Sequence, residues 1–187
     1  SKQEDPLRII GLLAKTFAQR LKHPLATVFH SASPYGLGDH HAVKYSVEPA
    51  TPQRFAALSA GSETDYLRDA LAESLRDEPI ELKVFIHVMS PRMVPLGYRS
   101  LAHIVEDATL DWSQLGAIKV HVASIELPQQ DATNADSLQT AERFRFNPWH
   151  ALAAHRPLGS LNRARLSAYR ASQSYRSRND VPSDASG

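Results

Sequence analysis

The residues of this chain with the clearest chemical potential lie in the segment RARLSAYRASQSYRSR, at positions 163–178. It carries five arginines and two tyrosines, and it has no acidic residue. A helix this polar is exposed to solvent or binds something other than ordinary protein core, unless the segment is disordered. On a helix, Arg165, Tyr169 and Arg176 fall within about 40° of one another. Two guanidinium groups would therefore flank one phenol on a single helix face.

A phenol between two cations favours its ionised form, because nearby positive charge and hydrogen bonding both stabilise the phenolate. A phenolate is a hard anionic ligand, and tyrosine serves as an axial ligand of haem iron in some proteins. The alternative is a solvated helix face or a phosphate-binding face for nucleic acid. On spacing alone, this second interpretation is the commoner one for a segment with arginines at 163, 165, 170, 176 and 178.

The composition indicates one globular domain with a hydrophobic core. The 187 residues are 42% hydrophobic and 22% charged, and the formal net charge is +1, so any basic function must be local. The absence of cysteine excludes disulfides, thiolate metal sites and cysteine nucleophiles. Residues 1–29 lack the apolar run of a signal peptide, and no later segment approaches the length of a membrane span. We therefore expect a soluble chain, for which the cytoplasm is favoured.

The nine histidines do not show the spacing of a metal site. His40 and His41 are adjacent, His87 and His121 fall on separate predicted strands, and the sequence has no HExxH motif. We expect these histidines on loops and sheet faces.

The remaining motifs also predict no catalytic site. No serine lies in a GxSxG motif. Gly36 and Gly38 precede a predicted strand, whereas a phosphate-binding glycine loop precedes a helix, so these glycines indicate a turn. The acidic cluster of Glu106, Asp107 and Asp111 is expected to be a solvated loop.

Two helices are predicted from the spacing of apolar residues. The first covers residues 6–22. The second begins at a capping-box pair, Ser62 and Asp65, and continues to Leu75. Residues 128–140 are predicted to be a polar connection.

Three strands are predicted at 42–47, 81–89 and 118–127, where β-branched residues are frequent. In the last strand the apolar positions change parity, which predicts a β-bulge near Ala123–Ser124. Three strands make an incomplete sheet for this many apolar positions. Either a further strand lies near residues 52–59, or another chain or a missing part of this one completes the sheet.

The fold class predicted from these elements is α+β. Residues 1–180 are expected to form a single domain, and residues 181–187 a disordered tail.

Residues 165–178 resemble the proximal haem segment of the catalases. That segment contains an arginine, then a tyrosine four residues later, then a second arginine seven residues after the tyrosine. Arg165, Tyr169 and Arg176 fill these three positions. The segments at 33–47, 106–130 and 146–165 are also similar to sequences of the smaller catalase-related haem proteins. The resemblance covers most of residues 7–178 and is most specific in residues 146–176.

The resemblance implies a role for each of the three residues. Tyr169 would be the proximal ligand of the iron of haem b, and Arg165 would hydrogen-bond its phenolate oxygen and polarise it. Arg176 would face a haem propionate. The implied activity is that of a haem-dependent oxidoreductase, which disproportionates hydrogen peroxide or uses hydrogen peroxide or organic peroxides to oxidise a second substrate.

Two departures from the catalase pattern refine this expectation. The large catalases continue after the tyrosine with Pro-Asp-Thr, whereas this chain has Arg170-Ala171-Ser172, as in the smaller relatives. Catalases also supply a distal histidine and asparagine from the amino-terminal half of their barrel. No segment of this chain resembles that distal motif, so the peroxide-cleaving acid and base have no candidate here.

The resemblance therefore predicts the carboxy-terminal half of a catalase-like core. We expect part of an antiparallel β-barrel, flanking helices and a C-terminal proximal haem helix. An amino-terminal half or a homo-oligomer partner would complete the protein, and the chain alone would be inactive and a weak haem binder. The alternatives are a haem-free structural remnant and a basic-helix module for phosphate or nucleic acid; nucleic acid is the less expected partner, and no membrane contact is expected.

Overall fold

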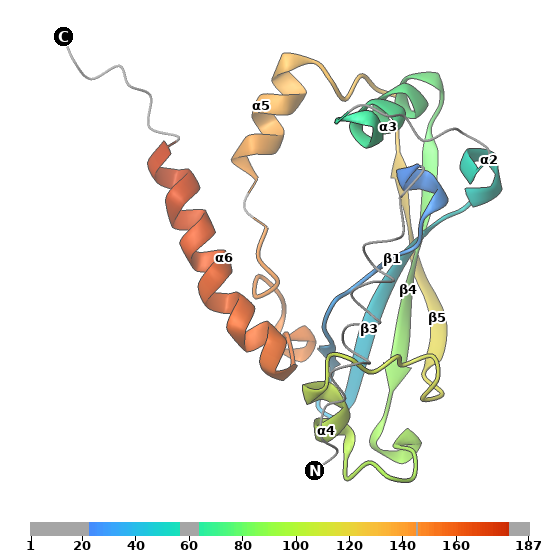
Figure 1. Cartoon of the computed structure of the whole chain (residues 1–187), viewed down its shortest axis with the longest axis vertical. Coiled ribbons are helices and arrows are strands. Elements are labelled where there is room, and N and C mark those ends of the chain that lie inside the picture. Colours follow the sequence, from blue (N-terminus) through green and yellow to red (C-terminus); the bar gives the residue numbers. More distant parts are fainter. Residues whose placement is uncertain (1–22, 57–63, 145, 180–187) are drawn as a thin grey trace.

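An open antiparallel sheet forms the centre of the computed structural model, which describes residues 23–56, 64–144 and 146–179 (Figure 1). The strands are β1 (Phe29–His30), β2 (Tyr35–Leu37), β3 (His41–Pro49), β4 (Ile80–Met89) and β5 (Ile118–Leu127). Their order is β1-β3-β4-β5, and β2 also pairs with β3. The described part of the chain thus combines an antiparallel sheet with helices, and its sheet does not close into a barrel.

The helices lie at the two ends of the sheet and beside it. They are α2 (Pro52–Ala56), α3 (Tyr66–Asp77), α4 (Leu101–Glu106), α5 (Ala135–Arg143) and α6 (Gly159–Asn179), with short 3₁₀ turns η1 (Pro24–Ala26), η2 (Pro91–Met93) and η3 (Ala153–His155). In Figure 1, α6 begins near α4 and diverges from the sheet along its length. None of the described helices is long and apolar enough to cross a membrane.

The three long strands occupy the ranges predicted from their β-branched residues, and the bulge prediction is also confirmed. Val84 of β4 pairs with Ala123, whereas the next residue, Phe85, pairs with His121. Val122 is therefore the extra residue, one position before the expected place. A bulge of this kind changes which sequence positions share a face of the strand. Ile118 and Val120 consequently lie on the same face of the sheet as Ile125 and Leu127.

The local structure differs from the sequence expectations at three places. Residues 52–56 form α2, so the further strand near 52–59, one of the two alternatives for completing the sheet, is absent from the described part of that range. The capping box placed Asp65 at the third position inside the helix. In the structure Asp65 is instead the N-cap residue of α3, and its side chain makes no capping hydrogen bond. The predicted polar connection contains α5, which begins after Asn134; the Asn134 side chain accepts a hydrogen bond from the amide of Ser137.

Other expectations fall on residues that the structure does not describe. These are the helix at 6–22, Ser62 of the proposed capping box, the remainder of the 52–59 range and the tail at 181–187.

Two hydrophobic clusters form the core, one at each end of the sheet. The cluster near α4 consists of Ala42, Met89, Ile104, Val105, Leu110 and Trp112. The cluster at the other end joins η1, α2, α3 and the start of β4 through Leu25, Phe55, Leu75 and Ile80. The first cluster attaches α4 to neighbouring ends of β3 and β4, and the second attaches η1, α2 and α3 to the opposite end of β4.

The segment before α6 runs antiparallel to β2. The amide of Gly36 donates to Arg156 O (2.8 Å), the amide of Gly38 donates to Ala154 O (3.0 Å), and the amide of Leu158 donates to Pro34 O (2.9 Å). These bonds fix the start of α6 relative to the sheet.

Gly159 begins α6 in a conformation that only glycine adopts easily, with φ of 83°. A Cβ atom there would lie 2.5 Å from the carbonyl oxygen of Val105. We expect Gly159→Ala to lower the free energy of unfolding by about 2 kcal/mol, because it adds backbone strain and a steric clash. Chemical denaturation of the two proteins measures this difference. As a control, Gly97→Ala also replaces a glycine of positive φ but meets no atom within 4 Å, so it should cost less.

Candidate functional site

Asn162 anchors the first turn of α6 to the connection between β1 and β2. Its side chain is buried, and its Nδ2 donates to the carbonyl oxygens of Pro34 and Leu158, at 2.8 Å each. Its Oδ1 accepts a hydrogen bond from Ser33 Oγ at 2.7 Å. Because these groups are buried, each bond replaces one that water would otherwise supply. α6 is thereby fixed to a loop 129 positions earlier in the sequence.

Arg163 connects the same turn to α4. Its guanidinium donates to both carboxylate oxygens of Glu106, at 2.9 and 2.8 Å, in a bidentate ion pair. The hydrogen bonds from Arg163 hold the pKa of Glu106 below its usual range. Glu106, expected in a solvated acidic loop, is instead the last residue of a helix and the partner of one of the five arginines.

Arg165 and Tyr169 are brought together by α6, as their spacing predicts. Arg165 Nη2 donates to the phenol oxygen of Tyr169 at 2.8 Å, and the guanidinium carbon lies 5.2 Å from the centre of the phenol ring. Arg165 Nη1 donates to Ser33 Oγ at 3.0 Å and is 3.4 Å from Asn162 Oδ1. The guanidinium is therefore held between Ser33 and Tyr169, and both Arg165 and Tyr169 are partly buried.

Arg176 is exposed, two turns further along α6. Among the residues that the structure describes, it forms no hydrogen bond or ion pair. It shares the helix face of Arg165 and Tyr169 but contacts neither of them.

Among the arginines of this segment whose side chains the structure describes, Arg163 and Arg165 have partners within the chain. Arg163 is paired with Glu106, and Arg165 is bonded to Ser33 and Tyr169. Less positive charge is free for phosphate groups than the sequence indicates.

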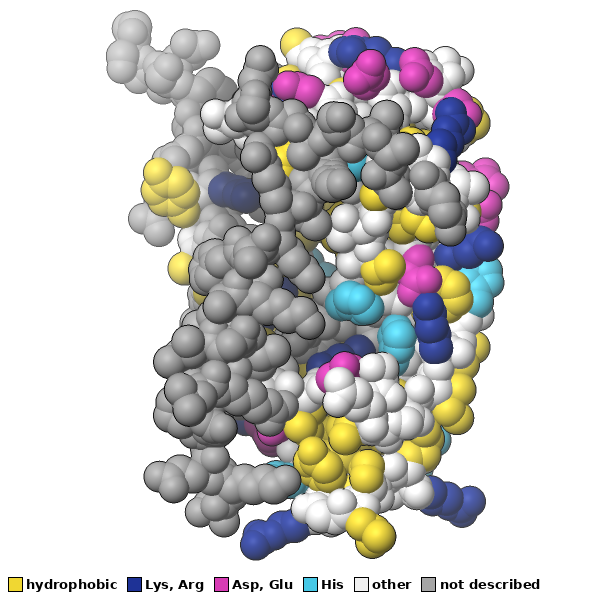
Figure 2. Space-filling view, turned by 45° about the vertical axis from the view of Figure 1, so that its right-hand side comes forward, with side chains coloured by type: hydrophobic (Ala, Val, Ile, Leu, Met, Phe, Trp, Pro, Cys, Tyr) yellow, Lys and Arg dark blue, Asp and Glu magenta, His cyan; other side chains and the backbone are white. Residues whose placement is uncertain are grey.

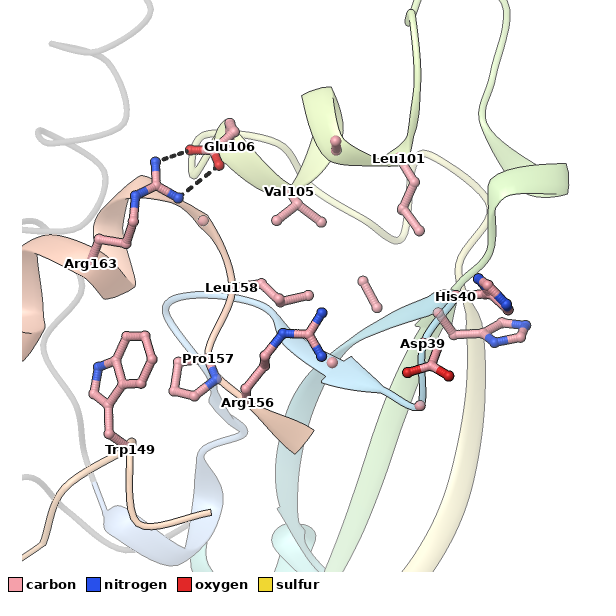
Figure 3. Close-up of a pocket in the computed structure, with 16 residues that line it drawn as sticks. Asp39, His40, Leu101, Val105, Glu106, Trp149, Arg156, Pro157, Leu158 and Arg163 are labelled. Atoms are coloured by element: carbon pink, nitrogen blue, oxygen red, sulfur yellow. Dashed lines mark hydrogen bonds and ion pairs between the residues drawn. The ribbon is translucent and has the colours of Figure 1, made fainter. Parts of the chain in front are cut away.

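Figure 3 shows a cavity of about 440 Å³ near the start of α6. Its walls come from the turn between β2 and β3, from α4, and from the segment that leads into α6. Leu101, Val105 and Leu158 form an apolar side, and Arg156 and Asp39 form a polar side. Arg165, Tyr169 and Arg176 are not among its described lining residues, so this cavity is separate from the predicted site.

Sequence reasoning missed two polar residues of the site, Ser33 and Asn162. Asn162 stands three residues before Arg165, a spacing that places the two on neighbouring turns of a helix and could have drawn attention to it. Ser33 gives no comparable signal, because its contact with α6 depends on the tertiary fold. Within the described residues, no group of three or more histidine, aspartate or glutamate side chains converges to hold a metal ion.

The comparisons with known proteins add evidence about the fold. No family model matches the sequence, and no curated protein matches it. The structure is similar to that of catalase A from Saccharomyces cerevisiae, with a TM-score of 0.54 and 19% sequence identity. The similarity covers 80% of this chain and 31% of that chain. The chain therefore spans about a third of the length of that catalase, and the two share a similar arrangement of antiparallel sheet and helices.

Proposed function

We propose that this chain supplies the proximal side of a haem site, in which the phenol oxygen of Tyr169 is the iron ligand. The observation that carries the proposal is the hydrogen bond of 2.8 Å from Arg165 to that oxygen. A phenol oxygen that accepts a hydrogen bond from a guanidinium has the chemistry that a tyrosinate ligand requires. The fold similarity to a catalase supports the same assignment.

Arg165 is the positioning residue of the proposed site. Ser33 and Asn162 hold one end of its guanidinium, so the other end is directed at Tyr169 without the freedom of an exposed arginine. A fixed positive charge stabilises the phenolate without reorganisation when a ligand binds. In this proposal Arg176, which is exposed on the same helix face, is available for a haem propionate.

Haem b would supply the peroxide chemistry, either disproportionation of hydrogen peroxide or oxidation of a second substrate by a peroxide. This chain's residues would bind and orient the haem from one side. An amino-terminal half would add the distal groups, as the catalase resemblance implies. The complete protein would then be a haem-dependent oxidoreductase.

Titration with haemin tests the proposal in the full chain, with optical spectra as the readout. We expect the native chain to give a tyrosinate-ligated spectrum and Tyr169→Phe to lose it, with at least a tenfold weaker haemin affinity, or about 1.4 kcal/mol. Tyr175→Phe is the matched control, because Tyr175 lies on the same helix and is 67% exposed. Its spectrum should equal that of the native chain.

The Arg165→Ala variant separates ligation from positioning. It keeps the phenol but removes the guanidinium, so we expect haemin to bind more weakly than to the native chain and still to give a tyrosinate-ligated spectrum, which Tyr169→Phe loses. Identical spectra for the native chain and Tyr169→Phe would exclude Tyr169 as the ligand. So would the absence of haemin uptake when an amino-terminal half is supplied.

A further inference from the structure

β5 has an edge that no other described strand covers. It is the last strand of the sheet order and pairs with β4 on one side only. Four of its apolar side chains are exposed, namely Ile118 (57%), Val120 (40%), Val122 (50%) and Ile125 (41%). In Figure 2, hydrophobic side chains alternate with charged and histidine side chains along the right-hand edge of the view. A long apolar edge of this kind tends to pair with another strand.

The sequence of β5, IKVHVASIEL, has a symmetry that identifies its partner. If a second β5 lies antiparallel beside it, with Ile118 opposite Leu127, then Lys119 is opposite Glu126 and Val120 is opposite Ile125. Ile118, Val120, Ile125 and Leu127 then each meet an apolar residue, and the charged residues meet their opposites. Such directly opposed pairs are the unit of stabilisation between antiparallel strands.

The bulge at Val122 makes this pairing possible. Residues 118 and 127 differ in parity, so in a regular strand they would point to opposite faces of the sheet. Because Val122 is an extra residue, Ile118, Val120, Ile125 and Leu127 share one face. Lys119 and Glu126 share the other face.

Other registers lose this complementarity. A slip by one residue places Ile118 opposite Glu126 and Lys119 opposite Ile125. A slip by two residues moves Lys119 opposite Ser124 or Pro128, and the charge pairs are lost.

We propose that two copies of this chain associate through their β5 edges, in the antiparallel register that pairs Lys119 with Glu126 of the partner. The two copies would be related by a two-fold axis perpendicular to the sheet, and their two sheets would join into one. The apolar faces of the two β5 strands would therefore lie on the same side of the joined sheet. Lys119 already contacts Glu48 of its own chain, and its side chain is 43% exposed, so it has further donors for a second carboxylate. This proposal does not depend on haem binding.

Engineered cysteines test the register, because the chain has no cysteine of its own. Directly opposed residues on antiparallel strands have Cα atoms about 4.5 to 5.5 Å apart, within the range of a disulfide. An equal mixture of Val120→Cys and Ile125→Cys chains should therefore form a covalent dimer under mild oxidation. Each variant alone should form at least tenfold less, because residues 120 and 125 are four ladder positions apart across the bulge and its two cysteines would be about 14 Å apart.

A charge reversal tests the proposed contact between the two β5 edges in a second way. Glu126 is opposite Glu81 of β4 within the chain. Glu126→Lys therefore removes a like-charge pair inside each copy. It also places Lys119 of each copy opposite a lysine of the other copy, which makes two repulsive pairs between the β5 edges. We expect light scattering with size exclusion to show a dimer for the native chain and a monomer for this variant, and we expect the far-ultraviolet circular dichroism spectra of the two to be equal. A native chain that is monomeric at its highest soluble concentration, or equal crosslinking in the single variants and the mixture, would overturn the proposal.

Discussion

Replacement of Asn162 by alanine is expected to lower the free energy of unfolding by about 3 kcal/mol. The buried amide is bonded to Ser33 Oγ and to the carbonyl oxygens of Pro34 and Leu158. Alanine would leave these groups without their partner in a site where water does not easily replace it. It would also leave a small cavity, which adds to the cost. Urea denaturation monitored by circular dichroism measures the change.

The control for this substitution is Arg170→Ala, which changes an exposed residue two turns along the same helix. It should change the free energy of unfolding by no more than about 0.5 kcal/mol. Ser33→Ala removes a single partner of Asn162 and should have an intermediate effect. If Asn162→Ala unfolds at the same urea concentration as the native chain, Asn162 does not anchor α6.

The second large effect is expected at His23, which makes the chain less stable in acid. His23 is buried, stacks on Phe55 with ring centres 5.0 Å apart, and accepts a hydrogen bond from the amide of Leu25 through Nδ1. Burial lowers the pKa of His23, and the carbonyl of Ala70 and the carboxylate of Glu73 oppose the shift more weakly. An accepting Nδ1 carries no proton, so protonation would break the bond to Leu25 as well as charge a buried ring.

The sign of the effect follows from the lowered pKa. The neutral ring contributes its full stability above the unfolded pKa of about 6.5, and this contribution is lost as pH falls through the lower folded value. We expect His23→Gln to cost about 2 kcal/mol at pH 7 and to lose less stability than the native chain between pH 7 and pH 5. Unfolding curves at several pH values measure both quantities.

Two other histidines serve as references for the acid effect. The exposed His40 has no comparable environment, so His40→Gln should keep the native pH dependence. His87 also has a pKa that burial lowers, with His30 and Lys119 acting in the same direction. Some loss of stability in acid should therefore persist in the His23→Gln chain. Equal pH dependence of the native and His23→Gln proteins would contradict the assignment.

The parts of the fold that could be predicted from the sequence have a strong local pattern. Residues 81–89 and 118–127 are long and rich in β-branched residues, and the parity change in the second range revealed the bulge near its true position. α4, with only six residues, and β2, with three, have no such pattern. β2 forms because it lies between β3 and the segment before α6, and a single-sequence pattern does not contain that pairing.

In the candidate site, too, the contacts between residues close in sequence could be predicted and those between distant residues could not. Arg165 and Tyr169 are four residues apart, so a helix alone brings them together, and the hydrogen bond between them could be predicted. Ser33, which holds the other end of the guanidinium, reaches the site only through the tertiary fold. The partner of Arg163, Glu106, is likewise distant in sequence, and it had the pattern of an exposed loop.

The contacts between β2 and the segment before α6 also have a consequence for the order of folding. They join residues 34–38 to residues 154–158, so more than a hundred residues must be brought into one loop before they form. The entropy of closing a loop of this length opposes early formation, whereas the pairing of β4 with its neighbours closes shorter loops. We therefore expect the sheet to form first and α6 to dock last. Residues that act only after docking, Arg165 among them, should change the unfolding rate more than the folding rate.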